Sequence, residues 1–197
     1  MRILVSLLLL SGITGCGPLV GQLMKLTEGV REIKIVDGDP LVFKKGVTIL
    51  VVPFSAGGKY PVYGDSDAAA FQRALSGSGY ATATLWPGNG GEDAGAAIAE
   101  IRSMPANELP PVGGLGENPD LVLFGTVLTR DIMIAPMRGR IMRVRYRLEF
   151  FEPVDKYSLI VEIEVRAHLK SAIGLAVQEL IGQVGVGKAS GQKSVDR

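Results

Sequence analysis

The only cysteine of the chain follows a short apolar segment near the N-terminus. Met1-Arg2 precedes the mostly apolar residues 3–10, an arrangement typical of an export signal. The segment is too short to cross a bilayer as a helix, which takes roughly 20 apolar residues. Ile13-Thr14-Gly15-Cys16 then matches the lipobox of bacterial lipoproteins at every position. We therefore expect residues 1–15 to be removed as a signal peptide and the Cys16 thiol to carry a diacylglycerol.

The alternative is an ordinary secretory signal with an accidental cysteine. Cys16 has no second cysteine with which to form an intramolecular disulfide, and a free thiol in an exported protein would be prone to oxidation. Lipidation explains it better, and two or three acyl chains such as palmitate hold a protein firmly on a membrane. Gly17 replaces the Asp that tends to retain lipoproteins in the inner membrane of enteric-type bacteria. In a bacterium with two membranes, we therefore expect a lipid anchor in the outer membrane and a domain that faces the periplasm.

Few other residues could perform covalent chemistry. His168 is the only histidine, so any Ser-His-Asp or Cys-His enzyme would have to use it. It falls where the last expected strand gives way to the last expected helix, without a nucleophile motif nearby, and we expect it to be structural. Gly182 to Ala189 imitates a phosphate-binding loop, but Ala189 stands where a Ser or Thr must hold magnesium, and the glycines follow a helix instead of opening one.

Carboxylates and metal ligands give no further site. Metal binding needs clustered Cys, His or carboxylate side chains, and the sequence offers no such cluster. The acidic residues near the helix starts are typical of caps and helix-dipole partners; they are Asp65, Asp67, Glu92 and Asp93. We expect no catalytic residue, no metal and no cofactor.

Five arginines lie close together between residues 138 and 147. Arg143, Arg145 and Arg147 share one face of an expected strand and could form a basic stripe for phosphate or an acidic partner. A hairpin that turns at residues 153–156 instead predicts that Arg147 faces Glu162 and that Arg145 faces Glu164, in exposed ion pairs. We favour the ion pairs. Arg138 and Arg140 have no such partner and are the candidates for contact with another protein.

Composition excludes one class of partner. Removal of residues 1–15 takes away Arg2 and no acid, which leaves 20 of the 21 basic residues against 20 acidic ones. Nucleic-acid binding requires a concentrated basic surface, so we expect no nucleic-acid partner.

The hydrophobic pattern predicts alternating strands and helices. Apolar runs and alternation indicate strands at 47–54, 80–86, 121–128, 141–151 and 158–166, whereas helical spacing indicates helices at about 66–76, 93–104 and 171–183. The order β-α-β-α-β-β-β-α predicts an α/β (α+β) fold with one mixed sheet and helices packed on it. Residues 16–46 should hold the anchor, a tether and a short ribbon around Asp37-Gly38, residues 47–185 the domain, and residues 186–197 a disordered tail.

Several of these segments resemble a known group of envelope lipoproteins. They are the lipobox, Val51-Val52-Pro53-Phe54, Gly79-Tyr80, the segment from Pro119 to Val127 with its Gly125-Thr126, and the strand from Tyr146 to Glu152. Together, over residues 47–185, they resemble lipoproteins with a CsgG-like or TolB-amino-terminal-like domain, which include activators of peptidoglycan synthases. The resemblance implies a mixed α/β domain that acts by protein–protein contact and has no catalytic residues. Pore-forming members insert long amphipathic hairpins into the membrane; we expect none here, because residues 87–119 are rich in Gly and Pro.

The leading hypothesis is a non-enzymatic accessory or assembly factor of a cell-envelope machine. Its expected partners are the membrane, through the lipid on Cys16, and one or more envelope proteins, and a homo-oligomer is compatible with the sequence. A periplasmic lipoprotein that binds a small molecule or glycan is the first alternative, and an envelope hydrolase is the second.

Overall fold

The computed structural model describes residues 28–56, 64–88, 94–113, 116–135 and 139–185. A single mixed sheet runs in the order β1-β7-β6-β5-β2-β4, with the short β3 paired to β5, as the sequence predicts for the fold class. The strands are β1 (Gly29–Asp37), β2 (Thr48–Val51), β3 (Ser55–Ala56), β4 (Thr82–Leu85), β5 (Leu121–Ala135), β6 (Gly139–Phe151) and β7 (Ser158–His168). The α-helices are α3 (Gly64–Gly77), α4 (Ala94–Ser103) and α5 (Ala172–Leu180).

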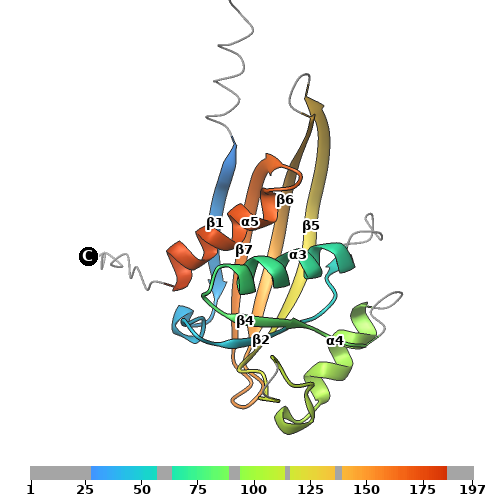
Figure 1. Ribbon diagram of the computed structural model, residues 1–197, viewed down its shortest axis with the longest axis vertical. Coiled ribbons are helices and arrows are strands. Elements are labelled where there is room, and N and C mark those ends of the chain that lie inside the picture. Colours follow the sequence, from blue (N-terminus) through green and yellow to red (C-terminus); the bar gives the residue numbers. More distant parts are fainter. Residues whose placement is uncertain (1–27, 57–63, 89–93, 114–115, 136–138, 186–197) are drawn as a thin grey trace, which may run out of the picture.

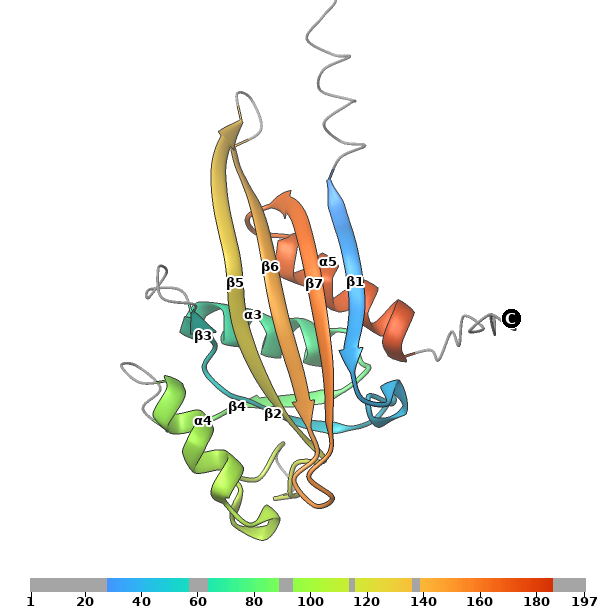
Figure 2. The same ribbon diagram turned by 180° about the vertical axis from the view of Figure 1, so that it is seen from behind.

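Helices cover both faces of the sheet, at different heights. Helices α3 and α5 lie along one face (Figure 1), and α4 lies against the lower end of the other (Figure 2). Each face therefore has its own apolar core. The larger core is closed by α3 and α5, and the smaller one joins α4 to β2, the start of β5 and the end of β6.

The unbroken apolar run at residues 47–54 contains the central strand β2. It pairs in parallel with β4 on one side and β5 on the other, and its two faces contribute to the two cores, Ile49 and Val51 to the larger and Leu50 to the smaller. Ile49, Leu50 and Val51 are fully buried, as expected for a central parallel strand. These parallel pairs, together with the antiparallel pairs of β5, β6 and β7, confirm the predicted mixed sheet.

The β6–β7 hairpin has the predicted register. Arg147 lies opposite Glu162 and Arg145 opposite Glu164. The other face of the two strands is fully buried under α3 and α5; it consists of Val144, Tyr146, Leu148, Phe150, Leu159, Val161, Ile163 and Val165. Strict alternation fixes such a register, because a slip by one residue would expose the whole apolar set.

The expected ribbon around Asp37-Gly38 is wrong. Residues 29–37 form one strand, β1, which pairs antiparallel with β7 at the edge of the sheet. Gly38 ends this strand with φ +88°, and a Cβ there would lie 2.1 Å from the Ser158 carbonyl oxygen. The sheet thus starts well before the boundary expected at residue 47. The pattern hid this because β1 is mostly exposed and alternates only weakly.

Strand β5 is much longer than the expected 121–128. It continues to Ala135 and pairs with β6 over its whole length, with one irregularity between Val127 and Thr129. The chain therefore contains a long two-stranded hairpin at residues 121–151. These strands belong to the sheet of the domain, so the expectation that the chain lacks membrane-inserting hairpins, which rested on residues 87–119, stays a prediction.

Candidate interaction surface

Part of the sheet has no helix over it. Beyond the end covered by α4, the strands β1, β7 and β6 are uncovered by any described helix in Figure 2. We call this surface the open face. It carries charged side chains in register on three strands: Glu32 and Lys34 on β1, Glu162, Glu164 and Arg166 on β7, and Arg143, Arg145 and Arg147 on β6.

Ion pairs connect these strands across the open face. Arg147 contacts Glu162 at 2.6 Å. Glu164 is shared, because its two carboxylate oxygens accept hydrogen bonds from Arg143 at 2.7 Å and Arg145 at 2.8 Å. Arg145 also lies 3.7 Å from Glu32 on β1. The predicted pairs are therefore confirmed, and the structure adds Arg143 to them.

The shared carboxylate of Glu164 titrates abnormally. Burial alone would raise its pKa, but the hydrogen bonds from Arg143 and Arg145 and the charges of both arginines outweigh that effect and lower the pKa below its ordinary value of 4.5. Glu164 is therefore ionised throughout the neutral range and is bound by its neighbours in that form.

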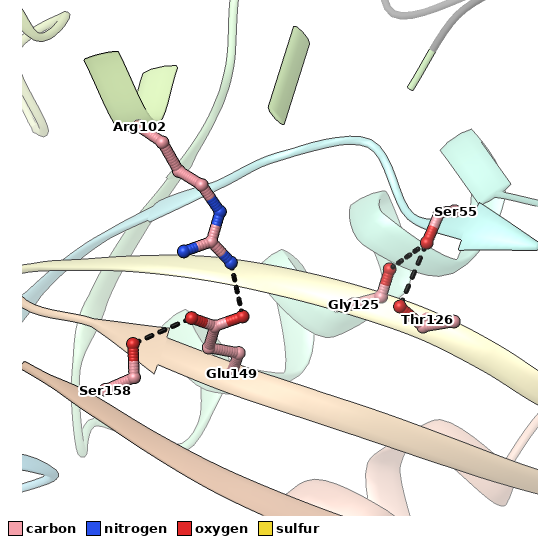
Figure 3. Close-up of polar contacts among 6 residues, drawn as sticks. All are labelled: Ser55, Arg102, Gly125, Thr126, Glu149 and Ser158. Atoms are coloured by element: carbon pink, nitrogen blue, oxygen red, sulfur yellow. Dashed lines mark hydrogen bonds and ion pairs between the residues drawn. The ribbon is translucent and has the colours of Figure 1, made fainter. Parts of the chain in front are cut away.

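Helix α4 is fixed to the lower end of the same face by one arginine. Arg102 donates to Glu149 at 2.5 Å, and Glu149 also accepts from the Ser158 hydroxyl at 2.7 Å (Figure 3). The Arg102 guanidinium lies over the Phe124 ring, 4.6 Å from its centroid. Because this arginine is held by both a carboxylate and an aromatic ring, it positions α4 and does not project as a free contact residue.

A second group of contact candidates lies at the end of the β5–β6 hairpin. Ile132, Met133 and Ile134 are consecutive and exposed, at 43%, 42% and 81% of their surface. Arg140 pairs with Ile134 in the ladder, is exposed, and has no side-chain hydrogen bond or ion pair within the described residues. We call these four residues the hairpin end. The hairpin projects beyond α3 and α5 in both views of the molecule (Figures 1 and 2).

A buried charged cluster lies beneath α3, where sequence reasoning did not find it. Asp67 of α3 and Arg130 of β5 form an ion pair, and the Tyr146 hydroxyl bonds to both, at 3.2 Å and 3.1 Å respectively. Asp67 and Arg130 are only 5% and 7% exposed. Burial raises the pKa of Asp67, while the charge and hydrogen bond of Arg130 act in the opposite direction. The role expected for Asp67, as a helix cap or dipole partner, is replaced by a buried cross-link between α3 and the sheet.

The chain is similar to known proteins only at the level of fold. No protein-family model matches it, and no curated protein matches it. Among solved structures, one chain of a PelC variant dodecamer from Paraburkholderia phytofirmans is 15% identical with a TM-score of 0.50, and the match covers 78% of this chain and 98% of that one. A second PelC dodecamer structure from the same organism is 17% identical with a TM-score of 0.47, over 78% and 93% of the two chains. At 15% identity the first match shows a shared fold alone.

The residues singled out from the sequence fall in three places. Cys16 and Arg138 lie outside the described residues, whereas Arg140 is at the hairpin end. His168 ends β7, is partly buried, and accepts a 3.5 Å hydrogen bond at Nδ1 from the Lys170 amide. This contact supports the turn into α5.

Within the described ranges, no group of three or more His, Cys, Asp or Glu side chains could hold a metal, and no helix there is long and apolar enough to span a membrane.

Proposed function

We propose that the chain is a lipid-anchored lipoprotein that serves as a non-enzymatic accessory or assembly factor of a cell-envelope machine. The lipobox that ends at Cys16 supports the anchor. The observation that carries the protein contact is the hairpin end, where consecutive exposed apolar side chains lie beside Arg140, which has no side-chain partner among the described residues. Soluble proteins seldom expose contiguous apolar side chains without a function, and arginine and large apolar residues are enriched in protein interfaces.

The described fold begins at the same end of the molecule as this surface, which supports a contact on the side of the chain's N-terminal segment. Four residues lie side by side across the sheet. Gly29, the first residue of β1, pairs with Arg166 of β7; Arg166 pairs with Arg143 of β6, and Arg143 pairs with Asp131 of β5. The hairpin continues four residues past Asp131 to Ala135, or about 13 Å. The described fold thus begins at the hairpin's end of the molecule (Figure 1). A partner bound at the hairpin end would meet the domain at the end where the described chain begins.

Self-association is part of the same proposal. The sheet order ends at β1 and β4, so each of these strands has one edge with no neighbouring strand among the described residues. Open edges are templates for pairing with another chain. The PelC variant whose chain matches with a TM-score of 0.50 is described as a dodecamer. Both observations support an assembly of several copies.

The anchor is tested by intact-mass analysis of the protein from membranes. We expect a mature chain that starts at Cys16 and carries the added mass of its acyl chains, and we expect Cys16→Ser to leave an unprocessed or soluble species. A free thiol at Cys16 in the mature protein would contradict the anchor.

The contact surface is tested separately by photocrosslinking in cells. A photoreactive amino acid placed at Ile134 should give a discrete adduct of higher mass, and Arg140→Glu should weaken it. The matched control is Leu41, which is similarly exposed at 72% but belongs to a 3-10 helix at the other end of β1. Equal adducts from both positions, or none from Ile134, would refute the hairpin end as the contact surface.

A further inference from the structure

Two arginines lie directly opposite each other on the open face. Arg143 of β6 and Arg166 of β7 are cross-strand partners. Two like charges on cross-strand partners destabilise a sheet. An acidic group between the two guanidinium groups would remove this repulsion. Their arrangement differs from that of Arg145 and Arg147, each of which lies opposite a glutamate.

The nearest acidic side chain, Glu164, cannot neutralise both Arg143 and Arg166. Glu164 lines the same hollow, but its oxygens are already engaged, one by Arg143 and the other by Arg145. The Arg166 Nε atom is shielded from solvent and donates no hydrogen bond to any described group. A shielded donor without an acceptor is costly, and an oxygen atom supplied by a ligand would satisfy it.

The space for such a ligand is present. A hollow of about 340 Å³ is lined by Arg31, Arg143, Glu164 and Arg166, which come from three adjacent strands. Three guanidinium groups therefore line the same hollow, beside a carboxylate whose oxygens are engaged by Arg143 and Arg145. Guanidinium groups recognise phosphate through paired N–H donors, and several acceptor oxygens are needed to meet donors from three sides.

We propose that Arg31, Arg143 and Arg166 form a binding site for a phosphate-type oxyanion on the open face. The site is independent of the lipid anchor and of the hairpin end, because none of their residues line it. Its phosphate is either free or carried by a membrane lipid headgroup, and the chemistry of recognition is the same for both.

The proposal is tested on the chain with Cys16→Ser, so that no acyl chain contributes to binding. Inorganic phosphate is titrated calorimetrically against a sodium chloride control of equal ionic strength. Arg166→Gln should weaken binding at least roughly tenfold, as expected for loss of a charge-assisted hydrogen-bond donor. Arg147→Gln is the matched control: it removes one positive charge from the same face but not from the hollow, and it should change the affinity less than about twofold.

Vesicles distinguish the two sources of phosphate. Co-sedimentation is compared for phosphatidylcholine vesicles with and without phosphatidic acid. Retention that needs phosphatidic acid and Arg166 identifies a lipid headgroup, whereas calorimetric binding without such retention identifies free phosphate. If Arg166→Gln unfolds, Arg31→Gln takes its place. Equal binding by the Arg166 and Arg147 variants, or no phosphate-dependent signal in either assay, would overturn the site.

Discussion

At the scale of single residues, Gly125 shows how tightly the larger core is closed. A Cβ at this position would lie 2.4 Å from three atoms of the Phe54 ring. That ring packs against Phe71 and Tyr146, with centroids 5.1 Å and 6.1 Å away. Next to it, the Ser55 hydroxyl contacts the Gly125 carbonyl and the Thr126 hydroxyl (Figure 3). Only glycine at this position leaves room for the Phe54 ring to pack against β5 beside the paired strand β3.

Replacing Gly125 by alanine should therefore destabilise the fold. We expect Gly125→Ala to lower the free energy of unfolding by about 1–3 kcal/mol, the usual cost of overpacking a core. The measurement is urea unfolding. Gly174→Ala is the control, since a Cβ there meets nothing within 4 Å; within helix α5 it should be stabilising by roughly 0.5–1 kcal/mol. An unchanged stability for Gly125→Ala would mean that Phe54 does not cover this residue.

Glu164 gives a pH-dependent prediction. Its pKa is lower in the folded protein than the ordinary 4.5, so its contribution to stability is fully present above pH 4.5 and is lost as the pH falls through the lowered value. We expect wild type to be more stable than Glu164→Gln at neutral pH, and the difference to shrink on acidification below pH 4.5. Unfolding curves at a series of pH values measure this difference. A constant difference across that range would contradict the ion pairs of Glu164.

At the scale of elements, one buried ion pair joins α3 to β5. Removing Asp67 would leave the Arg130 charge buried without its carboxylate. We expect Asp67→Ala to cost about 3–5 kcal/mol of stability, and Arg130→Met in addition to restore part of it, because an apolar side chain needs no partner. Breaking an exposed pair by Glu162→Ala should cost less than about 1 kcal/mol. Chemical denaturation of the four variants, including Arg130→Met alone, measures these losses of stability. If the losses of Asp67→Ala and Arg130→Met simply add in the double variant, the two side chains are not directly coupled.

The elements that the sequence predicts well are those with strong periodicity. Strict alternation defined the register of β6 and β7, and the continuous run at 47–54 revealed the buried β2. In both cases the pattern records burial directly, so no knowledge of distant partners was needed. The ion pairs of Arg145 and Arg147 followed from the same register.

The features that could not be predicted depend on contacts between distant segments. Strand β1 joins β7 across most of the chain, and its own pattern is weak because it lies at an edge. Arg130 lies beyond the strand expected at 121–128, yet it is buried in β5 and paired with Asp67, 63 positions earlier. The hollow around Arg166 was likewise hidden, since it needs the pairing of β1 with β7 to bring Arg31 beside Arg143.

At the scale of the whole molecule, the two ends differ. The hairpin end presents apolar residues beside the exposed Arg140, whereas the opposite end holds a hollow of about 410 Å³ between Leu41, Leu121 and Val154. Between them, the exposed β1 edge runs along one side of the molecule (Figure 2). An assembly that pairs copies along this edge leaves both ends accessible.

Such an assembly should depend on β1. Val36 is 42% exposed and lies at an irregularity of this edge strand, so Val36→Lys should leave the fold intact within about 0.5 kcal/mol, while the added charge opposes pairing with another strand. We expect the chain with Cys16→Ser to form multimers by native mass spectrometry, and Val36→Lys to shift it toward the monomer. Leu41→Lys adds the same charge at an exposed site outside the strand and should have no effect. If both variants keep the wild-type mass distribution, association does not use the β1 edge.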